Sequence, residues 1–250
     1  MNETKFDGMG RIYAQYRPSY PQSFIDYLFS DVGVTMDSVI ADIGSGTGIL
    51  TRQLLEKGNR VYAVEPNTDM RMMAEENLKA YPGFTSVNGT AEHTPLAGNS
   101  IDFITVAQAF HWFDRVDFKK ECQRILTAGG KVILIWNNKD EHSEQVQKLC
   151  EIHRAYCPNF QGFSGGMQFS AGDLFSTFFD GAYKTKVFRN DLVLDLNSFI
   201  GGSLSSSYAP KKQDEIYPAY IAALKAFFLQ FSKDGQLILP NVTLSYVGSV

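Results

Sequence analysis

VIADIGSGTGILT, residues 39–51, holds the pattern that decides the fold of this 250-residue chain. A short apolar run ends in Asp42, and a glycine-rich turn then leads into an apolar helical pattern. The turn consists of Gly44, Ser45, Gly46, Thr47 and Gly48. A strand that turns through glycines into a helix leaves backbone N–H groups free and adds little side-chain bulk, so a ligand can lie directly on the backbone. The stretch therefore predicts a buried strand, a helix and a nucleotide-type ligand site between them.

The spacing of the glycines indicates which ligand of this type fits. The order is Gly44-x-Gly46-x-Gly48 and not the G-x-G-x-x-G of dinucleotide-binding folds, and no lysine follows as it does in a P-loop. We expect the Asp42 carboxylate at the mouth of the turn, where it would repel a pyrophosphate and attract a cation. S-adenosylmethionine meets these conditions, because it has no phosphate and carries an ammonium and a sulfonium group.

The chain resembles the class I S-adenosylmethionine-dependent methyltransferases in five motifs that occur in the order and spacing of that family. They are the glycine turn, RVYAVE (60–65), NGTAE (88–92) with IDFITV (101–106), AQAFHWFD (107–114) and LTAGGKVILIWN (126–137). Apolar runs alternate with helical patterns over residues 39–136, which also predicts a parallel sheet covered by helices. The resemblance implies a Rossmann-like seven-stranded α/β sheet, mostly parallel with an antiparallel last strand, and helices on both faces.

The resemblance also implies a cofactor site for S-adenosylmethionine beyond the carboxyl ends of the strands, where ligands of parallel sheets bind. In this family an acid in the position of Glu65 binds both ribose hydroxyls. The candidate cofactor-binding residues are Asp42, Gly44, Ser45, Gly46, Thr47, Gly48, Glu65, Pro66, Asn67, Met70, Gly89, Thr90, Ala91, Glu92, Gln108 and Ala109. Other interpretations are a tight connection for the glycine turn, a solvated carboxylate for Glu65, ordinary loop chemistry for Glu92 and core packing for Met70.

The N-terminal segment FDGMGRIYAQYRPSYPQSFIDYL, residues 6–28, is dense in tyrosine. Small-molecule methyltransferases resembling this chain fold such a segment over the cofactor and the acceptor as a lid that excludes water. We therefore predict a lid over residues 1–30, with Tyr13, Tyr16 and Arg17 as candidate acceptor residues; Arg17 could pair with an acceptor carboxylate. The alternative is a helix packed on the sheet edge through Tyr13 and Tyr16.

The segment after the expected fourth strand contains the candidate catalytic residue, His111. It could act as a general base for a hydroxyl or carboxylic acceptor. Trp112 and Phe113 could stack on adenine or exclude solvent, and Trp112 is also a candidate acceptor residue. A role for all three in the pocket wall is favoured, because a carboxylate acceptor is already ionised at neutral pH and needs no base.

A metal site is not expected. Cys150, His153 and Cys157 recur at intervals of three and four and would share one helix face, as zinc ligands can. No fourth ligand lies nearby in sequence, and such residues also line half-buried helix faces. The chain also lacks the G-x-S-x-G elbow of a hydrolase.

Size and composition limit the remaining possibilities. The 250 residues, of which 44% are hydrophobic and 20% charged, can bury the core of a single domain. The net charge of −4 argues against a nucleic-acid binder. The longest apolar run, residues 132–136, is too short for a membrane span, the N-terminus lacks the apolar core of a signal peptide, and three cysteines are too few for a disulfide framework. We expect a cytoplasmic protein; its oligomeric state is left open.

Beyond residue 137 the regular alternation breaks, and we expect an insertion at about 138–180 between the fifth and sixth strands. It would contain a helix near 143–156 and a loop rich in glycine and phenylalanine. The expected elements that follow are a sixth strand over 182–194, a helix over 214–231 and a last strand over 237–247. The stretch 201–210 is interpreted as a solvated linker or a loop on the substrate side.

The predicted function is methyl transfer from S-adenosylmethionine to a small molecule, an acid or a phenol, by proximity and in-line alignment. YRPSYP and AQAFHWFD resemble the small-molecule branch that includes trans-aconitate methyltransferase and ubiquinone/menaquinone-pathway enzymes. Two other functions stay open: a non-catalytic S-adenosylmethionine-binding protein, and an NAD-dependent dehydrogenase, against which the glycine spacing and Asp42 count.

Overall fold

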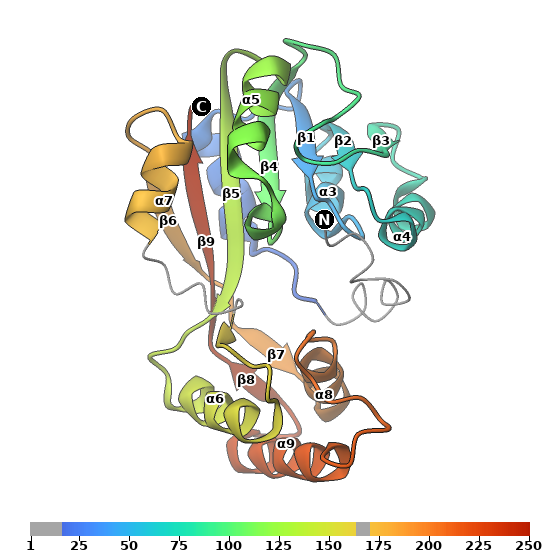
Figure 1. Ribbon diagram of the computed structural model, residues 1–250, viewed down its shortest axis with the longest axis vertical. Coiled ribbons are helices and arrows are strands. Elements are labelled where there is room, and N and C mark those ends of the chain that lie inside the picture. The colour runs from blue at the N-terminus through green and yellow to red at the C-terminus, as the bar shows by residue number, and fades with distance from the viewer. Residues whose placement is uncertain (1–16, 164–170) are drawn as a thin grey trace.

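The computed structural model describes residues 17–163 and 171–250, so Tyr13 and Tyr16 of the expected lid lie outside the described residues (Figure 1). Its main feature is a seven-stranded sheet in the order β3-β2-β1-β4-β5-β9-β6. The strands are β1 Val39–Ile43, β2 Arg60–Val64, β3 Phe84–Val87, β4 Ile101–Ala107, β5 Leu126–Lys139, β6 Lys184–Arg189 and β9 Asn241–Gly248. Only β9 runs antiparallel to its neighbours, β5 and β6. The predicted fold class is confirmed.

Helices cover both faces of this sheet, as its apolar strands require, since β1 and β4 are buried along nearly their whole length. One face packs against α5 Arg115–Ile125 and α7 Ala171–Phe178 through Phe118, Phe175 and Phe178. The other face packs against α2 Gln22–Tyr27, α3 Ile49–Glu56 and α4 Thr68–Leu78. No helix within the described residues is long and apolar enough to cross a membrane.

The N-terminal helix is part of the core rather than a lid. α2 continues into a π-helical turn, η2 Leu28–Val32, and both Phe24 and Leu28 are fully buried. The Phe24 ring packs edge-on against Phe188 of β6, with 5.6 Å between centroids. The lid expected over residues 1–30 is therefore wrong for residues 20–30, because these residues pack on strands that would otherwise face water.

A second, smaller lobe lies beyond the carboxyl ends of β5 and β6, and Figure 1 shows it below the sheet. It contains three helices and a two-stranded antiparallel sheet with an apolar core of their own. The elements are α6 Glu144–Tyr156, β7 Leu192–Leu194, α8 Leu196–Leu204, α9 Tyr217–Phe231 and β8 Leu237–Leu239. The chain thus enters the lobe twice, once after β5 and once after β6.

This arrangement differs from the single insertion expected at about 138–180. The segment that forms α7 returns to the main sheet, and the lobe is completed by residues 190–240. The expected strand 182–194 is two strands, β6 and β7, in different sheets, and the expected strand 237–247 is likewise divided into β8 and β9. Pro240 separates β8 from β9, because proline has no N–H to donate to a ladder. The stretch 201–210 is no linker, since it begins with the last turn of α8.

Candidate cofactor and acceptor site

The glycine turn between β1 and α3 has the conformation that its sequence predicts. Gly44, Gly46 and Gly48 have φ values of +68°, +57° and +82°, a region that suits glycine. A Cβ atom on Gly44 would lie 2.6 Å from that of Ala109, and one on Gly48 would lie 2.6 Å from Leu78 Cδ1. A Cβ atom on Gly46 would meet nothing within 4 Å. The outer glycines therefore allow close packing, while Gly46 faces open space.

The Asp42 carboxylate lies beneath the turn and not at its mouth, so that expectation is wrong. It is 1% exposed and accepts hydrogen bonds from Thr51 Oγ1 at 2.6 Å and Thr105 Oγ1 at 2.8 Å. Burial raises the pKa of Asp42 to about 6, against the opposing effect of the two hydroxyl donors. Asp42 thus joins β1 to α3 and β4 and supports the turn from below.

Glu65 connects the glycine turn to the end of β2. Its Oε2 atom accepts the Gly46 N–H at 2.9 Å, and its Oε1 atom accepts the Asn67 N–H at 2.9 Å. Burial raises the pKa of Glu65, and the two N–H donors act in the opposite direction. Because each carboxylate oxygen can accept about two hydrogen bonds, both oxygens retain capacity for a pair of hydroxyl donors.

Asn67 and Arg71 hold the segment that follows Glu65. The Asn67 side chain caps α4 by accepting the Met70 N–H at 3.0 Å, and Met70 itself is 3% exposed in the core, in agreement with the packing interpretation. Arg71 Nη1 donates to the carbonyl oxygens of Glu65 at 3.0 Å and Pro66 at 3.2 Å. Sequence reasoning did not identify Arg71; its position one helical turn after Asn67 is the only signal that could have found it.

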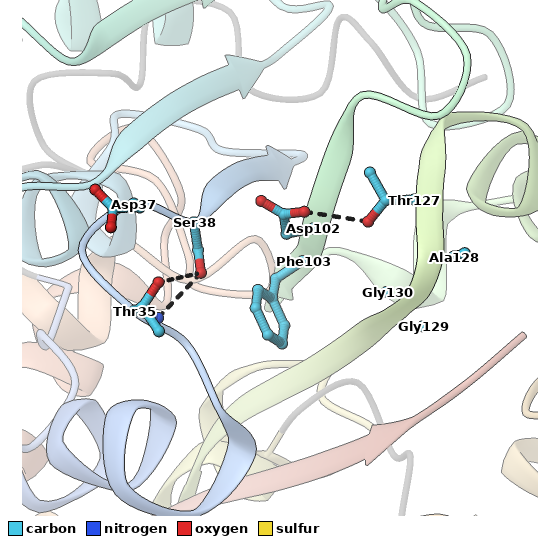
Figure 2. Close-up of a pocket in the computed structure, with 9 residues that line it drawn as sticks. All are labelled: Thr35, Asp37, Ser38, Asp102, Phe103, Thr127, Ala128, Gly129 and Gly130. Atoms are coloured by element: carbon cyan, nitrogen blue, oxygen red, sulfur yellow. Dashed lines mark hydrogen bonds between the residues drawn. The ribbon is translucent and has the colours of Figure 1, made fainter.

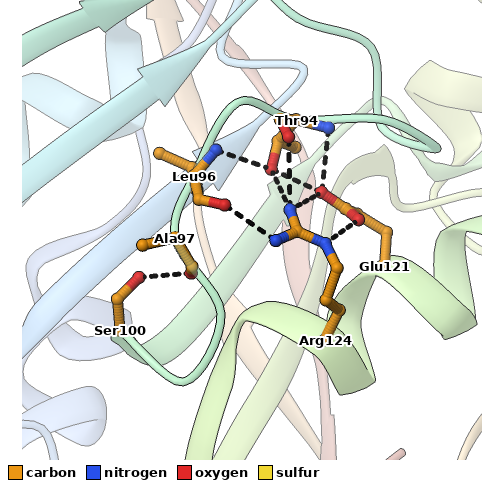
Figure 3. A network of polar contacts seen from close by, with 6 residues as sticks. All are labelled: Thr94, Leu96, Ala97, Ser100, Glu121 and Arg124. Carbon is orange, nitrogen blue, oxygen red and sulfur yellow. Dashed lines mark hydrogen bonds and ion pairs between the residues drawn. The ribbon is translucent and has the colours of Figure 1, made fainter.

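The loop after β3 is held by an ion pair of α5 between the buried Glu121 and the exposed Arg124, which Figure 3 shows. Arg124 donates to Glu121 through Nε at 2.7 Å and Nη2 at 2.6 Å, and Arg124 Nη1 donates to the Leu96 carbonyl at 2.9 Å. The Glu121 carboxylate accepts the Thr94 N–H at 2.8 Å. This network holds the loop that carries the candidate residues Gly89, Thr90, Ala91 and Glu92.

The exit of β4 completes the site. Gln108 adopts a φ of +60°, unusual for a non-glycine residue, and its Nε2 donates to the Asn137 carbonyl at 3.1 Å. Glu92 accepts the Asp114 N–H at 2.9 Å, which links the loops after β3 and β4. His111 and Trp112 are exposed on a short 3₁₀ turn, η3 Phe110–Trp112, and their rings lie 4.5 Å apart.

Two side chains of the turn show that the site suits a polar ligand. Ser45 Oγ and Thr47 Oγ1 are buried and lack a hydrogen-bond partner within the described part of the chain. Buried hydroxyls are nearly always hydrogen-bonded, so these two favour a ligand with polar groups over Gly46. Together with the Glu65 carboxylate, they fit the hydroxyl and ammonium groups of S-adenosylmethionine.

A shallow pocket of about 350 Å³ lies at the opposite, amino-terminal edge of the sheet, and Figure 2 shows its lining. Two carboxylates line it, Asp37 and Asp102, and Asp102 accepts the Val39 N–H at 2.9 Å and the Thr127 hydroxyl at 3.1 Å. These contacts explain Asp102 as a structural residue that joins β1, β4 and β5, so this pocket is not part of the cofactor site.

Of the three residues considered as zinc ligands, Cys150 and His153 lie on α6 and Cys157 is the residue that caps its C-terminus. His153 is 2% exposed and shares a hydrogen bond with Tyr220 Oη at 3.1 Å, and Cys157 is buried. Among the described residues no group of three or more histidine, cysteine, aspartate or glutamate side chains could hold a metal ion. The intervals of three and four between these residues place them on the helix face that packs into the apolar core of the lobe.

Comparison with known proteins gives the family. Residues 41–134 match the family described as methyltransferase domain. An uncharacterized methyltransferase of Bacillus cereus is 30% identical over 166 residues, which cover 59% of this chain and 76% of that protein. The chain belongs to the class I S-adenosylmethionine-dependent methyltransferases. An uncharacterized methyltransferase of Mycobacterium tuberculosis is 40% identical over 140 residues, which cover 56% of this chain and 55% of that protein. This methyltransferase chain thus spans about half the length of its mycobacterial relative.

Solved structures share the fold of this methyltransferase. A protein of Anaeromyxobacter dehalogenans has a TM-score of 0.68 at 20% identity, covering 94% of this chain and 98% of that one. Phosphoethanolamine N-methyltransferase 2 of Haemonchus contortus, solved with phosphomonomethylethanolamine and S-adenosylhomocysteine, has a TM-score of 0.52 at 16% identity, covering 99% of this chain and 56% of that one. Identities this low concern the fold alone. Family membership itself excludes the NAD-dependent dehydrogenase considered above.

Proposed function

We propose that this protein transfers the methyl group of S-adenosylmethionine to a small-molecule acceptor in the cytoplasm. One observation carries the proposal. The Gly46 N–H donates to the Glu65 carboxylate, which connects the turn after β1 to the end of β2, and the space over Gly46 beside this bond is open. The net charge of −4 and the lobe beyond β5 and β6 support a small molecule over a nucleic acid. We take the sheet and the lobe as one catalytic unit.

The residues of the turn would hold the methyl donor. The Glu65 carboxylate would accept from the ribose hydroxyls, Ser45 and Thr47 would bond polar groups of the ligand, and the loop with Gly89 and Ala91 would contact the adenine. When bound, S-adenosylmethionine supplies an electrophilic methyl group on a sulfonium. The protein's own contribution is to align the acceptor and exclude water, which accounts for much of the barrier reduction in such a step.

His111 would position the acceptor rather than take its proton. It is exposed beside Trp112 at the end of β4, where the acceptor approaches in this proposal. A carboxylate acceptor is ionised at neutral pH and needs no base, and a phenol would need one only if its own proton is retained on binding.

The test compares alanine variants of two glycines that both have a positive φ. Gly46 and Gly58 both have positive φ values, +57° and +94°, and a Cβ atom on either would meet nothing within 4 Å. Gly58 lies between α3 and β2, at the far end of the sheet from the turn. Gly46→Ala should weaken S-adenosylhomocysteine binding more than about tenfold, because the methyl group enters the ligand space, whereas Gly58→Ala should bind normally.

Turnover is measured by labelled methyl transfer into a metabolite extract, with mass spectrometry of the product. A labelled small molecule formed by the wild type and lost in Gly46→Ala supports the proposal. Equal binding by the two variants would contradict the assignment of the site. Binding without any labelled product would favour a non-catalytic S-adenosylmethionine-binding protein.

A further inference from the structure

Residues 17–21, with the sequence RPSYP, form a strap ahead of α2 that belongs to no helix or strand. Pro18 and Pro21 stiffen this strap, because the proline ring fixes φ and also disfavours the helical conformation in the residue before it. Pro21 itself is extended, with a φ of −68° and a ψ of 148°. Outside helices and sheets, backbone carbonyl groups depend on side chains or water for their hydrogen bonds. The side chains that bond the strap therefore decide where it lies.

Asn137, at the end of β5, bonds the strap through its side-chain amide. Its Nδ2 atom donates to the carbonyl oxygens of Pro18 at 3.4 Å and Ser19 at 3.3 Å. Its Oδ1 atom accepts from Asn190 Nδ2 at 3.2 Å and from the Thr243 hydroxyl. The amide thus uses both of its N–H groups and both lone pairs of its oxygen. Its orientation is defined, because exchanging the oxygen and nitrogen atoms would set two carbonyl oxygens against Oδ1.

Two further side chains bond the strap on either side of Asn137. Asn190, which follows β6, donates through Nδ2 to the Ser19 carbonyl at 3.0 Å. Gln53 of α3 donates through Nε2 to the Tyr20 carbonyl at 2.8 Å, and its Oε1 atom accepts the Tyr20 N–H at 3.1 Å. The strap is therefore bonded both to the helix that follows the glycine turn and to the ends of β5 and β6.

The backbone of Asn137 is bonded to the exit of β4. Gln108 Nε2 donates to the Asn137 carbonyl at 3.1 Å, and the Gln108 N–H donates to the Ile135 carbonyl at 2.9 Å. The φ of +60° at Gln108 is costly for a residue other than glycine and persists only where the surroundings hold it. Asn137 thus connects the β4 exit, through its carbonyl, to the strap, through its side chain.

We propose that Asn137 is a positioning residue for methyl transfer, whose side-chain amide holds the strap as one wall of the acceptor space beside the β4 exit. The inference rests on the proposed function, which brings the acceptor to this exit. Asn137 acts through the strap and touches no reacting atom. Such positioning affects the rate because in-line transfer depends on alignment, and a misplacement of about 1 Å can cost about a hundredfold.

The variant that tests this role is Asn137→Asp in the full-length protein. An aspartate keeps an oxygen that accepts from Asn190 and Thr243, but its second oxygen faces the carbonyl groups of Pro18 and Ser19 and cannot donate to them. The substitution therefore removes the bonds to the strap and leaves the other two. Asn190→Asp, which removes the third bond to the strap, is used in the same way if Asn137→Asp does not fold.

The matched control is Asn59→Asp, at the amino-terminal edge of the sheet. Asn59 Nδ2 also donates to two backbone carbonyl groups, those of Thr35 at 2.7 Å and Ser38 at 3.1 Å. A second control, Thr243→Val, removes one bond to Asn137 Oδ1 and leaves Nδ2 bonded to the strap. Both controls lose hydrogen bonds without releasing the strap.

Two measurements are made on each variant. Calorimetry with S-adenosylhomocysteine counts the folded cofactor sites, and labelled methyl transfer into a dilution series of the metabolite extract gives turnover per site. NMR follows hydrogen exchange of the Ser19 and Tyr20 amides, which are the N–H groups between the two prolines. Asn137→Asp should bind S-adenosylhomocysteine within about twofold of the wild type, lose more than about tenfold in turnover per site and exchange these amides faster. The controls should match the wild type in turnover per site and in exchange.

Three results would overturn the inference. Unchanged exchange in Asn137→Asp would show that Asn137 does not hold the strap. Wild-type turnover per site in that variant would show that the strap is held but does not position the acceptor. An equal loss of turnover per site in a folded control would indicate a general effect of stability. Failure of the proposed function is seen separately, as a wild type that forms no labelled small molecule.

Discussion

Replacement of Glu65 tests both the cofactor site and the construction of the glycine turn. Glu65→Ala should weaken S-adenosylhomocysteine binding by about 1.5–3 kcal/mol, a factor of about 10 to 150, because two hydrogen bonds from the ribose to a charged group are lost. Folding would be nearly unchanged in this variant if the carboxylate contacted only the ligand or water. The structure changes that expectation, since the carboxylate also accepts two backbone N–H groups.

The two N–H groups are not equivalent. Gly46 faces open space, so water can replace Glu65 there, whereas Asn67 is 5% exposed and its N–H would lose the Glu65 acceptor at a place that water reaches poorly. Loss of a buried hydrogen bond to a charged acceptor costs about 1–3 kcal/mol, and we expect the free energy of unfolding of Glu65→Ala to fall by that amount. Glu65→Gln keeps one acceptor oxygen and should lie between Glu65→Ala and the wild type in both measurements.

Titration calorimetry with S-adenosylhomocysteine and urea unfolding measure the two effects separately. Asp102→Asn is the matched control, because Asp102 also accepts a backbone N–H and a second donor, but at the opposite edge of the sheet (Figure 2). It should lose stability and keep its affinity. The reasoning is refuted if folded Glu65→Ala binds with wild-type affinity, or if Asp102→Asn loses as much affinity as Glu65→Ala.

Three further predictions concern Asp42, His111 and the N-terminal segment. Asp42 has a pKa of about 6 in the folded protein, above the 3.8 of an ordinary aspartate. Its contribution to stability is therefore present below about pH 4, and about 3 kcal/mol is lost as the pH rises through 6. Urea unfolding across this range should show that loss in the wild type and not in Asp42→Asn. His111→Gln should lower turnover less than about a hundredfold, and a loss above a thousandfold with intact S-adenosylhomocysteine binding would identify His111 as a base. A chain that starts at Asp31 should give the circular dichroism of an unfolded protein, because it lacks the buried Phe24 and Leu28. A chain that starts at Arg17 should fold and lose turnover, and full activity of this second chain would contradict a lid over the acceptor.

Local sequence patterns were sufficient to predict the sheet, and they predict a cofactor site at its carboxyl edge. Glycines at alternate positions after an apolar strand permit the left-handed turn, and the apolar runs of β2, β4 and β5 predict buried parallel strands because both of their faces are covered. Carboxyl ends of parallel strands meet at one edge, so Glu65, Glu92 and Gln108 could be assigned to the same site from their positions in the chain alone.

The remaining features depend on residues that are distant in sequence. Thr105 and Thr51 hold the Asp42 carboxylate under the turn, and nothing in residues 39–51 indicates that Thr105 of the neighbouring strand β4 bonds to it. The lobe combines two segments separated by β6, and the burial of Phe24 depends on Phe188, which lies more than 160 residues later. Such contacts follow from tertiary packing because hydrophobic burial and desolvation act between surfaces that the chain brings together only when it folds.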